Sequence, residues 1–320
     1  MRLHRRSLLA AALALAAAPA FAADPKEIRL DWATYNPVGL VLKEKGFLEE
    51  ALKPRGIAVR WVQSLGSNKA LEFLNAGALD IGSSAGAAAL VARINGNPIR
   101  AVYAFSRPEW TALVTRKDSG IATVADLKGR RIAVTRGTDP HIFLIRALQG
   151  AGLAERDAKL VLLQHADGRT ALDRGDVDAW AGLDPMMAAA EIENGDHLLF
   201  RDAAANTWGL LAVREAFAAE NPELVHAVVA AYERARLFAI RNPEALRSAL
   251  VTATKLPEPV IARQLARTDL SEPAVGEAQA GSIRAAGLAL QQAGLIPTAT
   301  DVPAAVNGLL DARFNPAPAR

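Results

Sequence analysis

Residues 64–86 read SLGSNKALEFLNAGALDIGSSAG, and the order of residue types in this stretch decides the fold. A small-residue loop precedes a helix predicted over residues 68–74, and a turn, a short strand and a second small-residue loop follow it. That second loop opens another helix. Helix N-termini carry N–H groups without intrahelical partners and a partial positive charge. The stretch therefore presents two places where an anion can bind without a charged side chain.

The segments around this stretch alternate between strand and helix. Strands are predicted over Ile28–Trp32, Ile57–Val62 and Ile99–Phe105. A helix is predicted from Pro37, whose missing N–H costs nothing in a first turn, to about Leu52. Alternation at this spacing is typical of an α/β fold with largely parallel sheets.

The alternation restarts after residue 106. A helix is predicted from Arg136 to about Ala151, and the part of the chain from Arg214 onward reads almost entirely as helix. We interpret that helical part as a layer packed on the first sheet. The strands predicted for the second unit, and the strand that leaves it, are Thr111–Thr115, Arg131–Thr135, Leu160–Leu163, Ala179–Ala181 and Thr207–Val213.

Entry into the second unit near residue 106 and exit near residue 206 imply two crossover connections. Two lobes joined by two strands can close on whatever lies between them. The predicted organisation is a leader over residues 1–22, a first lobe built from residues 23–106 and 206–320, and a second lobe over residues 107–205.

The first 22 residues have the composition of an export signal. Arg2, Arg5 and Arg6 form a basic region, residues 8–18 are apolar, and Ala20-Phe21-Ala22 is a small-x-small cleavage site. The apolar run is too short to span a membrane. Export by the general secretory route or by the twin-arginine route is compatible with this pattern, and it predicts a periplasmic protein.

Charge and cysteine content exclude several classes of function. The chain has 37 Lys and Arg against 34 Asp and Glu, and loss of the three leader arginines leaves a balanced mature chain. A neutral protein gives no case for nucleic-acid binding. The chain has no cysteine, which excludes disulfides, a lipid-anchored cysteine and thiolate metal sites. We expect a soluble exported monomer without a cofactor or metal.

Residues 82–86, GSSAG, match the G-x-S-x-G pattern of a hydrolase nucleophile elbow between a strand and a helix. Such an enzyme also needs an acid and a histidine downstream and an oxyanion hole upstream. No HGGG-like segment lies upstream. The downstream histidines are His141, His165, His197 and His226, and the last stands in an amphipathic helix. The sequence disfavours a serine hydrolase.

Four segments, found in order, carry a resemblance to a known family. They are ALEFLNAGALDIGSSAG (70–86), AVTRGTDPHIFLIRALQGAGL (133–153), DAWAGLDPMMAAAE (178–191) and NTWGLLAVREAFAAENPELV (206–225). Residues 24–310 resemble the periplasmic solute-binding proteins of ABC importers, in particular the branch for aliphatic sulfonates, taurine and nitrate. The resemblance implies a type II-like two-lobed fold, with a mixed sheet flanked by helices in each lobe. It also implies a ligand in the cleft between the lobes and an inner-membrane permease as partner.

Candidate ligand contacts in the first lobe follow from its two small-residue loops. Ser67 is also well placed to cap the helix that follows it. Aromatic and amide groups near the first strand complete the expected wall of a cleft that is mostly apolar with few polar groups. The candidates are Tyr35, Asn36, Ser64, Gly66, Ser67, Ser83 and Ser84.

The second lobe offers Thr135, Thr138 and His141 in the loop that opens its first helix. Asp139-Pro140 departs from the family pattern there, because the Asp side chain would cap the helix and occupy donors that an anion could use. This departure leaves three interpretations. The anion binds in the first lobe, or the ligand carries an amine, or the ligand is not a sulfonate.

Two further candidates lie near the strand ends that border the cleft. Asp184 could pair with a ligand ammonium or cap the helix after Pro185. Trp208 could line the cleft, although a single Trp is more often part of a core.

The sequence therefore predicts a binding protein rather than an enzyme, delivering a small organic anion to an ABC importer. An aliphatic sulfonate is the leading ligand class, and taurine, nitrate and a thiamine-precursor pyrimidine are the alternatives. An enzyme like the pyrimidine synthases that resemble these binding proteins, and a sensor that meets a receptor, stay open as other classes.

Overall fold

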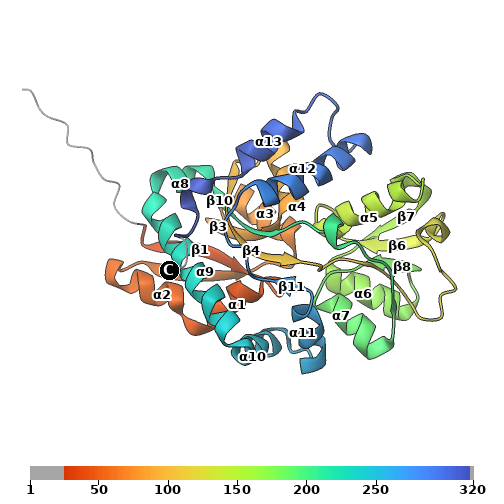
Figure 1. Ribbon diagram of the computed structural model, residues 1–320, viewed down its shortest axis with the longest axis horizontal. Coiled ribbons are helices and arrows are strands. Elements are labelled where there is room, and N and C mark those ends of the chain that lie inside the picture. The colour runs from red at the N-terminus through yellow and green to blue at the C-terminus, as the bar shows by residue number, and fades with distance from the viewer. Residues whose placement is uncertain (1–24, 318–320) are drawn as a thin grey trace, which may run out of the picture.

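The computed structural model describes residues 25–317 and contains two β-sheets, each flanked by helices (Figure 1). The predicted leader, residues 1–22, lies outside the described residues. We call the six-stranded sheet with its helices lobe 1 and the five-stranded sheet with its helices lobe 2. This arrangement confirms the predicted fold class.

The sheet of lobe 1 is mixed, with the strand order β11-β4-β10-β3-β1-β2. Strand β1 pairs in parallel with β2 and β3, whereas β10 runs antiparallel between β3 and β4. Its strands are β1 (Glu27–Trp32), β2 (Ala58–Gln63), β3 (Ile81–Ala85), β4 (Ile99–Pro108), β10 (Gly209–Arg214) and β11 (Thr268–Asp269).

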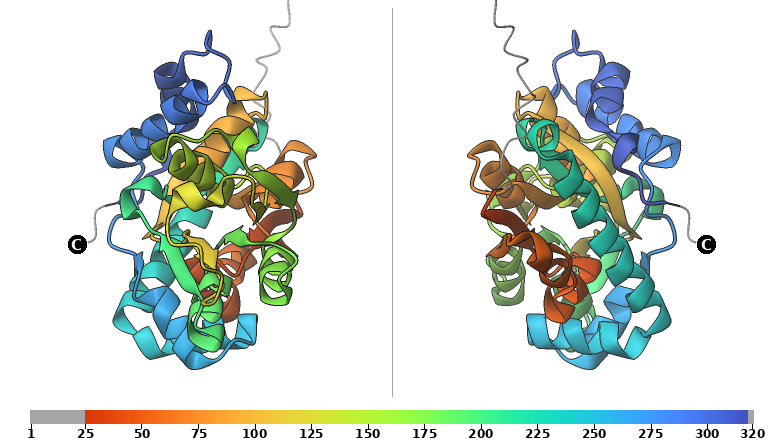
Figure 2. Two further views of the ribbon diagram at one scale, coloured as in Figure 1. Left: turned by 90° about the vertical axis from the view of Figure 1, so that its right-hand side faces the viewer. Right: turned by 90° about the vertical axis from the view of Figure 1, so that its left-hand side faces the viewer.

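The helices of lobe 1 enclose one large hydrophobic core around this sheet. The long helix α9 crosses one face, as the right-hand view of Figure 2 shows. The helices are α1 (Pro37–Lys45), α2 (Phe47–Leu52), η1 (Lys53–Arg55), α3 (Ser67–Asn75), α4 (Gly86–Ile94), α8 (Glu215–Glu220), α9 (Pro222–Arg241), α10 (Pro243–Thr254), α11 (Glu258–Leu265), α12 (Glu277–Gln292), α13 (Val302–Leu309) and η6 (Ala312–Phe314).

The sheet of lobe 2 has the order β7-β6-β8-β5-β9, and separate apolar clusters cover parts of it. Its strands are β5 (Leu113–Thr115), β6 (Arg131–Val134), β7 (Lys159–Leu162), β8 (Ala179–Ala181) and β9 (His197–Phe200). Its helices are η2 (Val124–Leu127), α5 (Asp139–Gly150), η3 (Glu155–Asp157), α6 (His165–Arg174), α7 (Met186–Ala189), the π-helical turn η4 (Ala190–Asn194) and η5 (Ala203–Ala205).

Two linkers join the lobes, residues 109–112 from β4 to β5 and residues 201–208 from β9 to β10. They are tied together, because the N–H of Thr111 donates to the side-chain carbonyl of Asn206 at 2.9 Å. Arg201 in the second linker also donates twice to the carboxylate of Glu109 in the first, at 2.7 Å for each bond. The lobes therefore connect through one braced hinge.

Strand β11 adds a connection that the sequence analysis did not predict. Thr268 and Asp269 pair with Pro108 and Arg107 at the end of β4, and the N–H of Glu109 donates to the carbonyl of Arg267 at 2.8 Å. A two-residue strand leaves no alternation to detect in the sequence. The segment between α11 and α12 thus lies against the hinge.

Two predicted element boundaries were wrong for local reasons. The helix predicted from Pro37 to Leu52 is broken at Gly46, which adopts a left-handed conformation (φ 64°) and separates α1 from α2. The helix predicted over residues 68–74 begins at Ser67 with Gly66 as its N-cap, so Ser67 does not cap it. The Ser67 side chain serves a different helix, as described below.

Candidate functional site

The carboxylate of Asp31, near the end of β1, joins the two small-residue loops. It accepts hydrogen bonds from the hydroxyl of Ser64 at 2.6 Å and from the N–H and the hydroxyl of Ser83, both at 2.7 Å. Asp31 is 1% exposed, and this burial raises its pKa to about 6 against the opposing effect of the three donors. Ser64 and Ser83 thus direct their protons at Asp31 and present only acceptor lone pairs elsewhere.

Tyr35 and Asn36, both predicted ligand contacts, are engaged within lobe 1. The hydroxyl of Tyr35 donates to the carbonyl of Ser83 at 3.1 Å. The side chain of Asn36 accepts from the N–H of Gly39 at 2.8 Å, which caps α1, and donates to the hydroxyl of Tyr232 at 3.4 Å. Asn36 is fully buried, so its amide holds α1 against α9.

The N-terminus of α4, the second of the two predicted anion positions, is closed by protein groups. The N–H of Ala85 donates to the Ser67 hydroxyl oxygen at 3.0 Å, and the N–H of Gly86 donates to the carbonyl of Trp208 at 2.9 Å. The N–H of Ala87 donates to the hydroxyl oxygen of Thr207 at 3.1 Å. The hydroxyl of Ser84 donates to the carbonyl of Ala85. An anion would have to displace these partners.

The N-terminus of α3 is open. Its N-cap Gly66 has no side chain, and its carbonyl accepts from the N–H groups of Lys69 and Ala70 at 3.0 and 3.1 Å. The N–H groups of Ser67 and Asn68 donate to no acceptor within residues 25–317. The Ser67 hydroxyl oxygen accepts from the N–H of Ala85, and the same side chain interacts with the Tyr35 hydroxyl. The two free N–H groups suit an anion at this end of α3.

The loop that opens α5 in lobe 2 has the same character. The hydroxyl of Thr135 donates to the carbonyl of Leu163 at 2.8 Å, and the hydroxyl of Thr138 donates to the carbonyl of Thr135 at 2.6 Å. These hydroxyl protons are therefore committed. The N–H groups of Thr138 and Asp139 meet no acceptor among the described residues.

The interpretation of Asp139 as the cap of α5 was wrong. Thr138 is the N-cap, and Asp139 is the first helical residue. Its carboxylate turns toward the hinge, where Trp110 Nε1 and the N–H of Thr207 each donate to Oδ2 at 2.9 Å and the Thr207 hydroxyl donates to Oδ1 at 2.7 Å. Asp139 does not occupy the N–H groups of α5, so an anion at this loop remains compatible with the sequence.

The open ends of α3 and α5 face each other across the cleft. A Cβ built on Gly137 would lie 3.9 Å from Cβ of Asn68, which belongs to the other lobe. Beside these loops lies a hollow of about 300 Å³, lined by Asn68 of lobe 1 and by residues of lobe 2. Its lining residues are Asn68, Thr135, Arg136, Leu162, Leu163, Gln164 and Asp167.

His165, the first residue of α6, brings the two lobes into contact. A Cβ built on Gly66 would lie 3.0 Å from His165 Nε2, so a larger residue at Gly66 would crowd His165 when the lobes are in this arrangement. His165 is 1% exposed, and desolvation lowers its pKa to about 3. The structure is therefore a closed arrangement of the lobes, with Gly66 and Asn68 packed close to lobe 2.

The remaining predicted contacts have partners of their own. His141 Nε2 lies 3.7 Å from the carboxylate of Glu155 in lobe 2, and burial lowers the pKa of His141. Trp208 is buried in the second linker, with the guanidinium of Arg107 5.5 Å from its ring centre.

Asp184 was predicted either to cap the helix after Pro185 or to pair with a ligand ammonium. In the structure its carboxylate accepts from a helix N–H and pairs with a cation of the protein. The carboxylate accepts from the N–H of Ala188 at 2.9 Å. It also accepts from Arg267 of lobe 1, at 2.8 Å from Nε and 2.9 Å from a terminal nitrogen. Both oxygens of Asp184 are thus engaged without a ligand.

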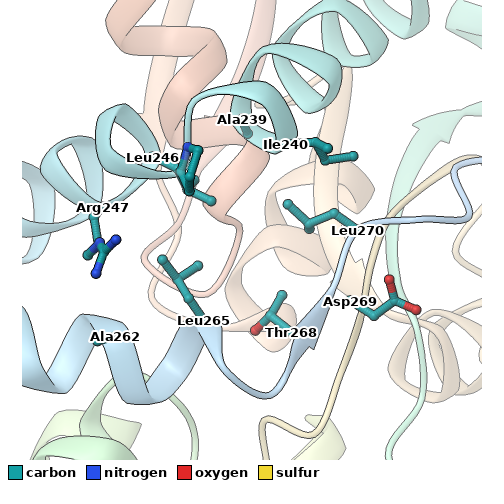
Figure 3. A pocket seen from close by; sticks show the side chains of 10 residues that line it. Ala239, Ile240, Leu246, Arg247, Ala262, Leu265, Thr268, Asp269 and Leu270 are labelled. Atoms are coloured by element: carbon teal, nitrogen blue, oxygen red, sulfur yellow. The ribbon is translucent and has the colours of Figure 1, made fainter.

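A hollow outside the cleft lies on lobe 1, between the α9–α10 junction and the α11–β11 segment (Figure 3). Its volume is about 400 Å³. In Figure 3, Ile240, Leu246, Leu265 and Leu270 line it, with Arg247 and Asp269 toward its margins. It lacks convergent polar groups of the kind that α3 and α5 provide, so we place the ligand in the cleft.

Sequence reasoning missed four residues that shape the cleft: Asp31, Trp110, His165 and Thr207. Asp31 is the single acidic residue in the strand sequence IRLDW, between two apolar residues, a signal that could have marked it as buried and partnered. Trp110 lies in the first linker, and its ring meets that of Tyr35 edge-on with the ring centres 5.9 Å apart. His165 had been considered only as a hydrolase histidine. No sequence signal separates Thr207 from other threonines.

Within the described residues, His, Asp and Glu form no group of three or more that could hold a metal ion. No helix in the same range combines the length and apolar character that crossing a membrane requires. The chemistry available in the cleft is that of N–H donors at two helix ends, hydroxyl and imidazole acceptors, apolar walls, and the charged residues Arg136 and Asp167.

Two mixed α/β lobes with a cleft between them define the class of the periplasmic binding proteins, and a solved structure supports this. The alkanesulfonate-binding protein SsuA from Xanthomonas axonopodis pv. citri, bound to MOPS, has a TM-score of 0.81 and 26% sequence identity. The alignment covers 89% of this chain and 99% of that one.

Relatives in sequence agree with this class. One, assigned as an aliphatic sulfonates-binding protein of Escherichia coli (strain K12), is 32% identical over 247 residues, which are 76% of each chain. The taurine-binding periplasmic protein of the same strain is 28% identical over 254 residues, 76% of this chain and 75% of the relative. The model of the NMT1/THI5-like family matches residues 38–246. The chain belongs to the NMT1/THI5-like family.

Proposed function

We propose that this protein is the periplasmic solute-binding component of an ABC importer and that it captures an aliphatic sulfonate between its lobes. The observation that carries the proposal is the pair of helix N-termini, α3 from lobe 1 and α5 from lobe 2, that face one cleft. The N–H groups of Ser67 and Asn68, and those of Thr138 and Asp139, have no acceptor within the described residues. An anion between them would satisfy donors from both lobes and favour the closed arrangement.

A tetrahedral oxyanion suits this geometry because it presents acceptor oxygens in several directions. A sulfonate stays ionised at every physiological pH, so it needs no proton from the site. Neutral N–H donors can bind it without a buried counter-charge, whose desolvation would cost binding energy. Arg136 lines the hollow next to α5 but already lies 3.3 Å from the Glu155 carboxylate. The apolar part of the ligand would meet Leu162 and Leu163, which line the same hollow.

The names of the relatives support the ligand class. Aliphatic sulfonates, MOPS and taurine, which those names mention, all carry a sulfonate group. For this chain we propose export by the leader at residues 1–22, a periplasmic location, a monomer and an inner-membrane permease as partner. We also retain the proposed division of the chain at residues 106 and 205.

A thermal-shift screen tests the ligand class. The mature protein is heated alone and with alkanesulfonates, taurine, nitrate, a pyrimidine and the matching alkyl carboxylates. A ligand that binds only the folded state stabilises that state by about 2.7 kcal/mol when the free ligand concentration is 100 times its Kd. The melting temperature rises as a result. A shift with alkanesulfonates is the expected result. A shift with nitrate or a pyrimidine alone would overturn the sulfonate assignment.

A charge substitution tests the position of the anion. Asn68→Asp places a carboxylate in the first turn of α3, where it competes with the ligand for the free N–H groups. We expect a loss of sulfonate affinity of about tenfold or more, with the melting temperature unchanged or raised. Asn75→Asp adds the same charge at the opposite end of α3 and serves as the control. Equal losses in the two variants would place the anion elsewhere.

A further inference from the structure

The hydrogen bond with Thr135 determines which ring nitrogen of His165 carries the proton. Nδ1 of His165 lies 3.1 Å from the Thr135 hydroxyl oxygen. That hydroxyl has one proton, which it donates to the carbonyl of Leu163 at 2.8 Å. Thr135 therefore accepts from His165, and Nδ1 carries the ring proton. In the neutral ring Nε2 is then a lone-pair acceptor.

Nε2 of His165 is buried, lacks a hydrogen-bond partner within residues 25–317, and points at the opposite lobe. A Cβ built on Gly66 would lie 3.0 Å from Nε2 and 2.8 Å from Oδ1 of Asn68, another buried atom without a partner in that range. Both acceptors thus lie next to Gly66, which directly precedes the free N–H groups at the open end of α3. A buried acceptor that finds no donor is unfavourable, so its presence at a ligand site selects among ligands.

The imidazole stays neutral in the closed arrangement. Burial lowers the pKa of His165 to about 3, and desolvation is the only cause. No carboxylate lies within ion-pairing distance of its ring among the described residues, so nothing holds a second proton on it. At neutral pH the group facing Gly66 is therefore an acceptor rather than a cation.

We propose that His165 is a specificity-determining residue that selects ligands carrying an N–H or O–H group a short chain away from their acid group. The ligand donates this hydrogen bond to Nε2 while its anion binds the helix N-termini. This inference rests on the proposed function, because it takes the anion at α3 as given. Asp167 also lines the hollow, and a polar ligand suits this residue better than a purely apolar one.

The selection works mainly by rejection. A ligand with a methyl group in place of its hydroxyl would bury Nε2 against carbon and leave the acceptor unpaired. Sites that are built to accept a substrate OH or NH discriminate strongly against the analogue that lacks it. The adjacent positions of Gly66 and of the first free N–H of α3 require a short spacer between donor and anion. The simplest ligand of this kind has a two-carbon spacer between its donor group and its anion.

Calorimetry with two nearly isosteric ligands tests the proposal. The probes are 2-hydroxyethanesulfonate, which has a donor, and 1-propanesulfonate, which has a methyl group in its place. We expect the wild type to bind the hydroxyl ligand about tenfold or more tightly. His165→Leu should abolish this preference by weakening 2-hydroxyethanesulfonate while leaving 1-propanesulfonate unchanged or improved. Equal weakening of both ligands would assign His165 a packing role and overturn the proposal.

The outcomes separate this proposal from the proposed function. If the wild type binds both sulfonates without preference, the function stands and the role of His165 is wrong. If it binds neither, the sulfonate assignment and this inference both fail. Proton uptake on binding, measured as a buffer-dependent heat, would show that His165 becomes a cation and donates to the anion, which also overturns the proposal.

A measurement on the wild type keeps the test valid if His165→Leu does not fold. With ¹⁵N-labelled histidine, the Nε2 resonance reports whether its lone pair accepts a hydrogen bond. In the complex with 2-hydroxyethanesulfonate we expect the shift of a nitrogen that accepts a hydrogen bond, and in the complex with 1-propanesulfonate the shift of a nitrogen without one. The same shift with both ligands would contradict the donor selection.

Discussion

Asp139 of lobe 2 and Thr207 of the second linker are joined by two hydrogen bonds. The N–H of Thr207 donates to Oδ2 of Asp139 at 2.9 Å, and the Thr207 hydroxyl donates to Oδ1 at 2.7 Å. The same hydroxyl oxygen accepts from the N–H of Ala87 at 3.1 Å. A buried carboxylate at the start of α5 is thereby connected to the start of α4 in the other lobe.

Substitution of Thr207 should separate the role of its hydroxyl from that of its shape. Thr207→Val keeps the volume but leaves Oδ1 of Asp139 and the N–H of Ala87 without their partner. We expect a loss of roughly 1–3 kcal/mol in the free energy of unfolding, measured by urea denaturation. Thr207→Ser keeps the hydroxyl and should lose less. A loss in Thr207→Ser with none in Thr207→Val would mean that packing of the methyl group, not the hydrogen bonds of the hydroxyl, stabilises the hinge.

A side chain at Gly66 should block closure without disturbing the fold of lobe 1. Its Cβ would approach His165 Nε2 to 3.0 Å, a contact across the cleft that opening of the lobes relieves. The approach to Oδ1 of Asn68 within lobe 1, at 2.8 Å, is to the end of a flexible side chain that can rotate away. Gly66 has an extended backbone (φ 165°), so alanine meets no conformational barrier there. For Gly66→Val we expect ligand affinity to fall by about tenfold or more, because a closed arrangement that is less populated lowers the apparent affinity.

The control for Gly66 is Gly281, where an added Cβ meets no atom within 4 Å. Gly281 lies within α12, so Gly281→Ala should leave binding unchanged and raise stability by about 0.5–1 kcal/mol. Small-angle scattering measures closure directly. Normal ligand-induced compaction of Gly66→Val would contradict the proposed contact.

Arg267 joins the lobes through a buried ion pair. It donates to Asp184 at 2.8 and 2.9 Å and to Glu191 at 3.2 Å, and the side chains of Arg267 and Asp184 are 8% and 2% exposed. Arg267→Met leaves Asp184 buried and uncompensated, which should cost about 3–5 kcal/mol. The exposed pair of Arg247 and Glu244 provides the control, and Arg247→Ala should cost less than about 1 kcal/mol. Similar losses in the free energy of unfolding for the two variants would contradict the prediction that the buried pair is the costlier one to break.

The sequence predicted the architecture well because alternation of strand and helix is a local signal. The small-residue loops before α3 and α5 and the chain's passage between two sheets follow from spacing alone. The three-dimensional partners of polar groups do not. Asp139 has the sequence context of a cap, yet its carboxylate turns to Trp110 and Thr207, which come from linkers distant in the sequence.

The candidate site shows the same division between local and tertiary information. Ser64, Ser83 and Ser67 were predicted from residue type, and all three are buried near the cleft. Whether each hydroxyl donates or accepts depends on its neighbours. Asp31 accepts the protons of Ser64 and Ser83, and the N–H of Ala85 donates to the oxygen of Ser67. Whether a hydroxyl donates to a ligand or accepts from it is decided by such partners, and no spacing in the sequence specifies them.

Two buried groups should influence acid stability in opposite directions. The pKa of His165 falls from 6.5 to about 3, so between these values the unfolded chain binds a proton that the folded chain does not. Its contribution to stability is therefore present above pH 6.5 and is lost as pH falls toward 3. The pKa of Asp31 rises from 3.8 to about 6, so its contribution is present below pH 3.8 and is lost as pH rises through 6.

The free energy of unfolding, measured from pH 7 to pH 4, tests these signs in single variants. Replacing one group removes a slope of up to about 1.4 kcal/mol per pH unit in its window. His165→Gln should therefore make the acid-induced loss shallower than in the wild type between pH 6 and 4. Asp31→Asn should make the loss steeper, because the compensating proton uptake of the folded state disappears. Variants that change the slope in the same direction would show that at least one of the two groups is not buried as the closed structure has it.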